Sequence, residues 1–200
     1  MLLKDLGAEV VNGDYDSPSS LSAAFSGADA VFCNTNFWDR MSLDEEIHQG
    51  VAAAKAAAEE PSVKNFIYST LPDGRKVLGG IYQDNLIYNA KAITLERIEA
   101  EFPELYKITT KLSIAFYHDN WVKYQLPFGP IKQEDGVFEM AVPYPSTNKI
   151  ATVSPDDAGV VIAAILDAGY KYHGKWISLA AESLTDDEKL ASWTKGKLSS

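Results

Sequence analysis

The sequence predicts an α/β fold in which helices flank a doubly wound parallel sheet. Short apolar runs rich in Val, Ile, Phe and Thr alternate with longer segments whose apolar residues recur every three or four positions. The order strand, helix, strand at short spacing is typical of βαβ crossovers, which build parallel sheets. The 200 residues are 46% hydrophobic, which is enough for one globular domain with a substantial core.

Five runs have the composition of buried strands. They are residues 8–12 (AEVVN), 30–34 (AVFCN), 65–69 (NFIYS), 108–114 (ITTKLSI) and 176–180 (WISLA). Helices are expected between them. Ser17 followed by Pro18 is typical of a helix start. Residues 43–59 keep one apolar face and place acidic residues in the first turn, where the helix dipole favours them, and residues 85–101 repeat the stripe before Pro103.

The composition changes after Trp121. Residues 124–150 are rich in Pro, Gly and aromatic residues, which predicts a long excursion with a hairpin around residues 134–136. Two further helices are expected, one opening at Ser154 and one opening at Ser183 or Thr185 and running to Trp193. We therefore predict a single domain, with residues 1–120 forming a partial sheet core and residues 121–200 a smaller α+β portion on the substrate or partner side.

Charge and cysteine content exclude several classes of function. With 18 basic and 28 acidic residues the net charge is -10, which repels phosphate backbones and disfavours direct binding of nucleic acid. No apolar run approaches the roughly 20 residues of a membrane span, and Lys4 and Asp5 interrupt the start, which does not resemble a signal peptide. The single Cys33 and the absence of zinc-type spacing predict no disulfide, no metal site and a cytoplasmic or nuclear location.

The candidate site lies at the carboxyl ends of the predicted strands, where open α/β sheets bind ligands. The loops there are residues 13–15, 34–38, 69–71 and 115–120, and they combine polar and aromatic residues in a way that suits a nucleotide. Asp14 and Asn34 are equally expected to cap turns or helices.

Lys91 is the candidate cation, because an ammonium in the middle of the helix over residues 85–101 can reach the strand ends and hold a ribose or phosphate. An exposed helix lysine is the common alternative. The position four residues earlier is Ile87, so the sequence lacks the tyrosine–lysine pair in which an ammonium lowers the pKa of a phenol for acid/base catalysis. No catalytic residue is assigned, and Cys33 is expected to be an inert buried thiol.

Seven stretches together resemble the NmrA-like family of atypical short-chain dehydrogenase/reductase relatives. They are LGAEVVNGDYDSPSSLSAAFSGADAVF at residues 6–32, TNFWD at 35–39, EEIHQG at 45–50, VKNFIYSTLP at 63–72, NAKAITLERIE at 89–99, FYHDNW at 116–121 and VSPDDAG at 153–159. The resemblance implies a Rossmann domain that binds NAD or NADP. The site residues that it implies are Asp14 and Tyr15 near the adenine, Thr35, Asn36 and Phe37 along the middle of the dinucleotide, His48 where relatives can carry a lysine, Lys91, and Tyr117 and Asn120 near the nicotinamide.

The resemblance also implies a choice of functions. Family members range from redox-sensing regulators, which bind a dinucleotide and a protein partner such as a transcription factor, to reductases of small molecules. A missing tyrosine–lysine pair is normal for the sensing members, so we predict a dinucleotide-sensing regulator or a degenerate member of the family. The alternatives are an NADP-dependent oxidoreductase of secondary metabolism and a scaffold that binds no cofactor.

Relative to the family, the sequence is short at both ends. The resemblance implies a first strand, a glycine turn, a helix and a second strand before Met1, and further elements after the last helix. No G-x-G-x-x-G motif, whose backbone approaches the pyrophosphate, occurs in the 200 residues. We therefore expect dinucleotide binding by this chain to be weak or undetectable, and we expect its sheet to have an exposed edge.

Overall fold

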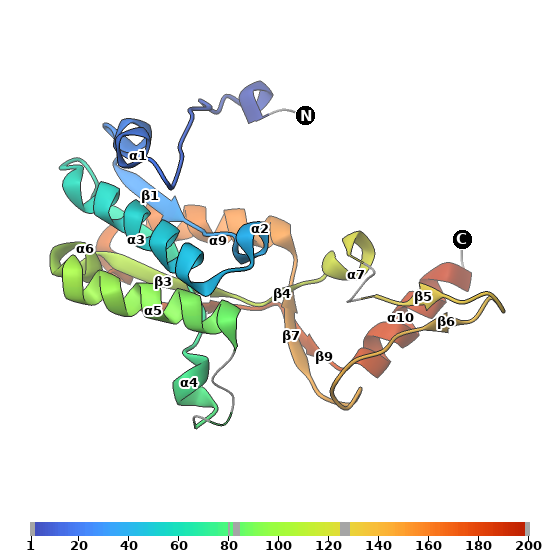
Figure 1. Cartoon of the computed structure of the whole chain (residues 1–200). Coiled ribbons are helices and arrows are strands. Elements are labelled where there is room, and N and C mark those ends of the chain that lie inside the picture. The colour runs from blue at the N-terminus through green and yellow to red at the C-terminus, as the bar shows by residue number, and fades with distance from the viewer. Residues whose placement is uncertain (1–2, 80, 82–84, 125–128, 199–200) are drawn as a thin grey trace. The chain divides into compact units, whose positions relative to one another are not determined.

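The computed structural model describes residues 3–79, 81, 85–124 and 129–198 (Figure 1). The chain forms two compact units, the first from Met1–Ser113 with Ala164–Ile177 and the second from Ile114–Ala163 with Ser178–Ser200. The predicted division near residue 120 stays a prediction. Within the described residues, no helix has the length and apolar character that a membrane crossing requires.

The first unit is built on a four-stranded sheet with the order β1-β2-β3-β8. Its strands are β1 (Ala30–Cys33), β2 (Asn65–Ser69), β3 (Thr109–Ile114) and β8 (Trp176–Leu179). The first three run parallel, in a register that pairs Val31 with Phe66 and Phe66 with Thr109. The predicted fold class, a parallel α/β sheet flanked by helices, is confirmed, and four of the five predicted strands form.

Helices alternate with these strands in the first unit. They are η1 (Leu3–Leu6), α1 (Pro18–Phe25), α2 (Phe37–Arg40), α3 (Leu43–Glu59), α4 (Gly74–Val77), α5 (Leu86–Glu101), α6 (Pro103–Lys107) and η2 (Gly169–Tyr172). Figure 1 shows α3 and α5 side by side along the sheet. Residues from both helices bury the aromatic rings of Phe66 and Tyr68, which stack with their centroids 6.4 Å apart.

The two long helices approach closely because α3 presents very small residues. A Cβ atom added at Gly50 would lie 2.5 Å from Cγ2 of Thr94 in α5, and Ala53 and Ala54 are completely buried. Thr94 is itself held in place, since its hydroxyl donates to the carbonyl of Ala90 at 2.9 Å. The α3–α5 contact therefore depends on the absence of a side chain at one position.

The predicted strand at residues 8–12 does not form, and this expectation is wrong. These residues follow η1 as an irregular segment in which Val10 and Val11 are more than half exposed. A strand is stable only when a neighbouring strand completes its backbone hydrogen bonds. β1 pairs only with β2 within the described sheet, so its outer edge is unpaired and this segment does not complete it.

The second unit contains a small sheet of order β4-β7-β9 and a separate hairpin. Its elements are β4 (Phe116–Tyr117), α7 (Asn120–Lys123), β5 (Ile131–Lys132), β6 (Phe138–Glu139), β7 (Ile150–Val153), β9 (Glu182–Leu184) and α10 (Asp186–Leu198), and α9 (Pro155–Asp167) begins in it. The predicted hairpin is confirmed, since β5 and β6 pair antiparallel around Gly136, whose φ of 85° suits glycine.

The structure distinguishes between Ser183 and Thr185, the two predicted starting points of the last helix. Ser183 lies in β9, so the helix does not open there. Thr185 caps α10 instead: its hydroxyl accepts from the Glu188 N–H at 3.0 Å, and the Glu188 carboxylate accepts from the Thr185 N–H at 2.8 Å. This reciprocal pair is a capping box, which satisfies two otherwise unpaired donors at the helix start.

Replacing Gly50 with Ala should destabilise the protein, because the new Cβ must displace the Thr94 side chain from its buried hydrogen bond. We expect a net loss of about 1–2 kcal/mol in the free energy of unfolding, after the helix propensity gained by alanine is deducted. Urea denaturation measures it. The matched control is Gly159→Ala in α9, where no heavy atom lies within 4 Å of the new Cβ. That variant should be as stable as the wild type or more so, and equal stability of both variants would contradict the prediction.

Candidate functional site

A buried cluster of three polar side chains lies at the carboxyl end of β1. Thr35 follows the strand, Glu46 lies in the first turn of α3, and Lys91 lies in α5. The Thr35 hydroxyl donates to Oε1 of Glu46 at 2.7 Å, and Nζ of Lys91 lies 3.1 Å from the same carboxylate oxygen. The lysine and glutamate side chains are only 10% and 1% exposed. The cluster therefore joins three separate elements through a buried ion pair.

The Lys91 ammonium has three hydrogens, and three acceptors surround it. Besides Glu46 it contacts the carbonyl of Thr35 at 3.2 Å and the hydroxyl of Thr35 at 3.1 Å. The lysine ammonium therefore has protein acceptors on all sides. The second carboxylate oxygen of Glu46, Oε2, is a buried acceptor that receives no hydrogen bond among the described residues.

Glu46 was not identified from the sequence, although a signal for it exists. The acidic residues of α3 were assigned to the helix dipole as a group. Glu46 alone precedes Gly50 by four residues and Ala53 by seven, so it shares the buried face of the helix with them. An acidic residue in register with the smallest apolar residues of a helix indicates a buried carboxylate, which requires a cation nearby.

Tyr15 and Cys33 lie beside this cluster. Tyr15 is half-buried and packs against the core cluster that contains Cys33. Burial raises the pKa of Tyr15 to about 12 and that of Cys33 to about 12. The positive charge of Lys91 opposes the rise at Cys33 without cancelling it. Both groups therefore stay protonated at neutral pH, and the thiol is not a nucleophile there.

Asp14 and Asn36 make local structural contacts. Oδ1 of Asp14 accepts from the Asp16 N–H at 2.9 Å, which closes a turn before α1. The Asn36 side chain caps α2 by accepting from the Trp38 N–H at 3.3 Å. Phe37 is buried, and its ring meets that of Trp38 edge-on with the centroids 5.9 Å apart. The sequence predicts that Asp14 either contacts a nucleotide or caps a turn, and its hydrogen bond to Asp16 directly supports the turn.

Arg40, in α2, ties the two loops of this edge together. Its guanidinium pairs with Asp16, in the loop before α1, and with Glu45 of α3 at 2.8 Å. The chain then turns sharply at Met41, which adopts a φ of 48° at the end of α2. A left-handed backbone conformation is strained at a residue other than glycine. The ion pairs of the preceding residue, Arg40, help to stabilise the turn despite this strain.

The remaining predicted residues do not join the cluster. His48 is exposed and lines a surface groove of about 350 Å³ with residues of α1 and α5. Tyr117 and Asn120 belong to the second unit, where Tyr117 is half-buried in β4 and Asn120 begins α7. Burial raises the pKa of Tyr117. The structure thus brings together Tyr15, Thr35 and Lys91 of the predicted set and adds Glu46 to them.

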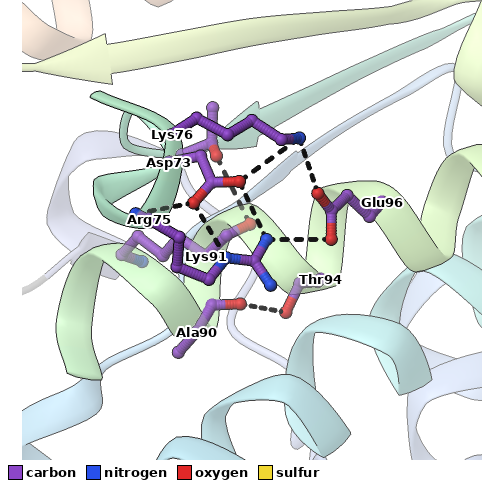
Figure 2. Close-up of polar contacts among 8 residues, drawn as sticks. Asp73, Arg75, Lys76, Ala90, Lys91, Thr94 and Glu96 are labelled. Carbon is purple, nitrogen blue, oxygen red and sulfur yellow. Dashed lines mark hydrogen bonds and ion pairs between the residues drawn. The ribbon is translucent and has the colours of Figure 1, made fainter. Parts of the chain in front are cut away.

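A cluster of charged residues contacts α5, the helix that carries Lys91, at Glu96 (Figure 2). Arg75 of α4 contacts Asp73 at 2.8 Å and Glu96 of α5 at 2.9 Å, and Lys76 contacts the same two carboxylates at 3.3 and 2.8 Å. Hydrogen bonds from Arg75 hold the pKa of Asp73 well below its usual range, and those from Lys76 lower the pKa of Glu96. The loop after β2 is thereby attached to the helix of the candidate site.

Comparison with known proteins agrees with this architecture. A sequence model described as the NmrA-like family matches residues 1–198. An NmrA-like family domain-containing protein of Dictyostelium discoideum is 24% identical over 188 residues, which cover 92% of this chain and 60% of that protein. The NmrA-like family domain-containing oxidoreductase notA of Aspergillus sp. (strain MF297-2) is 38% identical over 82 residues, 39% of this chain and 24% of notA.

Among solved structures, NmrA, a negative transcriptional regulator, superposes with a TM-score of 0.80 at 23% identity, covering 96% of this chain and 59% of NmrA. NmrA has also been solved in complex with NAD and with NADP. At this identity the likeness establishes the fold alone. The chain spans about three fifths of the length of NmrA and of the Dictyostelium protein.

Replacing Lys91 with Met should leave the Glu46 carboxylate buried without its cation, which costs about 3 kcal/mol or more of unfolding free energy. In the double variant Glu46→Gln with Lys91→Met, the loss should be smaller than the sum of the two single losses, because neither charge remains. Denaturant titration of the four proteins measures the coupling. Lys55→Met in the exposed part of α3 is the control and should change stability little. Additive losses from the two site substitutions would show that the pair is not coupled.

Acid should weaken the cluster around Asp73. Its folded pKa is depressed, so its contribution to stability is complete above the unfolded value of 3.8 and is lost as the pH falls from about 4 towards the folded pKa. We expect the melting temperature of Asp73→Asn to lie below that of the wild type at pH 6 and to fall less steeply between about pH 4 and pH 2. Asp39→Asn, an exposed aspartate of α2, is the control and should keep the wild-type slope. Parallel curves for Asp73→Asn and wild type would contradict the assignment.

Proposed function

We propose, from the premise that this chain belongs to the NmrA-like family, that it acts as a dinucleotide-sensing regulatory protein and not as a reductase. One observation carries the proposal: the Lys91 ammonium donates two hydrogen bonds to Thr35 and forms a buried ion pair with Glu46. A lysine that assists hydride transfer must instead face the cofactor or a proton donor. The position four residues before Lys91 is Ile87, so the tyrosine–lysine spacing of an acid/base pair is missing on this helix.

The residues of the first unit suit the ribose and base of a dinucleotide better than its phosphates. The cations at this edge of the sheet are engaged, Arg40 with Asp16 and Glu45, and Lys91 with Glu46. Asn36 is exposed at the start of α2, where its amide can meet a ribose hydroxyl, and Trp38 beside it is 61% exposed. Contacts of this kind bind weakly compared with a charged phosphate cradle. We therefore expect NAD or NADP to bind weakly, with Tyr15, Thr35, Asn36 and Phe37 nearest to it.

The regulatory output under this proposal is a protein contact. The net charge of -10 disfavours direct binding to DNA, so an effect on transcription would pass through a protein partner such as a transcription factor. The name of NmrA as a negative transcriptional regulator supports this direction. The location predicted from the cysteine content, cytoplasm or nucleus, stays a prediction.

A second candidate is an NADP-dependent oxidoreductase that acts on a small molecule. The observation that favours it is the 38% identity with the oxidoreductase notA over 82 residues. In that function Lys91 would have to leave Glu46 and turn towards the cofactor. The buried carboxylate would then lose its only cation among the described residues, which makes the rearrangement costly.

Calorimetric titration of the 200-residue chain with NAD and with NADP tests the proposal. We expect weak, saturable binding, with no loss of NADPH absorbance when carbonyl compounds are added. Lys91→Met should weaken binding by about tenfold, which corresponds to about 1.4 kcal/mol, because the loop at Thr35 loses its anchor. Lys55→Met is the matched control and should bind as the wild type does. Turnover of NADPH would favour the oxidoreductase, and no binding of either dinucleotide would leave only the scaffold interpretation.

A further inference from the structure

The second unit contains a pocket of its own, on one face of the β4-β7-β9 sheet. Residues paired across neighbouring strands point to the same face of a sheet. Phe116 pairs with Thr152, and Thr152 pairs with Glu182, so these three side chains form a row. Together with α7 and α10 the row lines an open pocket of about 380 Å³. Its lining residues are Phe116, His118, Trp121, Thr152, Glu182, Leu184, Lys189 and Ser192.

The hydroxyl of Thr152 is the unusual feature of this pocket. The side chain is only 1% exposed, and its Oγ1 has no hydrogen-bond partner within the described ranges of the chain. Buried hydroxyls in folded proteins nearly always have a partner, because leaving water without one costs free energy. Since Thr152 lines the cavity, the missing partner can be supplied by a molecule in the pocket.

The carboxylates around the pocket each have a nitrogen atom nearby. Nζ of Lys189 lies 3.1 Å from Oδ1 of Asp186, and both side chains are at most 10% exposed. Nε2 of His118 lies 3.7 Å from Oε1 of Glu182. A charged ligand would have to compete with these partners and lose its own water. An uncharged ligand avoids both costs.

Part of the pocket wall is apolar and aromatic, formed by Phe116, Trp121 and Leu184. Phe116 and Leu184 come from the sheet, and the ring of Trp121 lies against Lys189, whose Nζ is 5.6 Å from the ring centroid. Flat rings pack well against such walls, in offset or edge-on contact. The volume falls near the lower end of the range of small-molecule sites, about 300 to 1,000 Å³, so a single ring with one short substituent fits.

We propose that this pocket binds a small uncharged molecule that carries one aromatic ring and one carbonyl oxygen. The ring packs between Phe116 and Trp121, and the oxygen accepts a hydrogen bond from the Thr152 hydroxyl. The site goes beyond the proposed dinucleotide function and does not depend on it, because every lining residue belongs to the second unit.

Three probes of similar shape test the ligand class in fluorine NMR with the full 200-residue chain and no dinucleotide. Para-fluoroacetophenone has the ring and the carbonyl, para-fluoroethylbenzene lacks the oxygen, and para-fluorobenzoate carries a charge. We expect saturable line broadening with the ketone and binding at least about tenfold weaker for the other two. Equal binding of the ketone and the hydrocarbon, tighter binding of the benzoate, or no binding of the ketone would overturn the proposal.

Two hydroxyl variants then test the position of the contact. Thr152→Val keeps the side-chain shape and removes a hydroxyl that has no protein partner, so we expect an unchanged or higher melting temperature and about threefold to tenfold weaker binding of the ketone. Ser192→Ala removes a hydroxyl from the same pocket that already donates to the Glu188 carbonyl at 3.0 Å, so binding should change less than about twofold. Equal effects of the two substitutions would remove Thr152 from the site. If Thr152→Val lowers the melting temperature sharply, the hydroxyl serves the fold, and the assignment of its partner to a ligand is wrong.

Discussion

The buried ion pair between Glu46 and Lys91 is the constraint on which the candidate site depends. Two charges removed from water are tolerated only when each has its partner and the remaining hydrogens find acceptors. Thr35 meets that requirement with both its hydroxyl and its carbonyl. The loop after β1, the start of α3 and the middle of α5 are therefore linked, and a shift of any one of them exposes a charge without a partner.

The packing around the pair reinforces this link from two sides. On one side, Gly50 of α3 admits Thr94 of α5 at a distance that no other residue type would allow without displacement. On the other side, Arg75 and Lys76 of α4 hold α5 through Glu96. Lys91 precedes both contacts along α5, by three and five residues. Its position follows from helix packing as well as from its own hydrogen bonds, which is why a turn of the ammonium towards a ligand requires more than a change of side-chain rotamer.

The sequence was sufficient for the fold and only partly sufficient for the site. Periodicity located α3 and α5 and four of the five strands, because each element is stabilised by neighbours within the same unit. Residues 8–12 have an equally clear strand composition, yet composition does not state whether a neighbouring strand exists to pair with them. The helix position of Lys91 and the family resemblance both indicate this lysine, whereas neither predicts the ion pair that engages it, since pairing between α3 and α5 depends on three-dimensional contact.

Charged side chains in both units have partners in the same chain. In the first unit Arg40 and Lys91 pair with carboxylates, and in the second Lys189 pairs with Asp186 while His118 lies near Glu182. Among the described residues, the buried side-chain oxygens without a hydrogen bond include Oε2 of Glu46 in the first unit and Oγ1 of Thr152 in the second. Recognition at either place would therefore rest on hydrogen bonds and ring packing, which discriminate by shape and by donor or acceptor pattern. Attraction for an anion would contribute little, so a phosphate-bearing ligand would be held by its ribose and base.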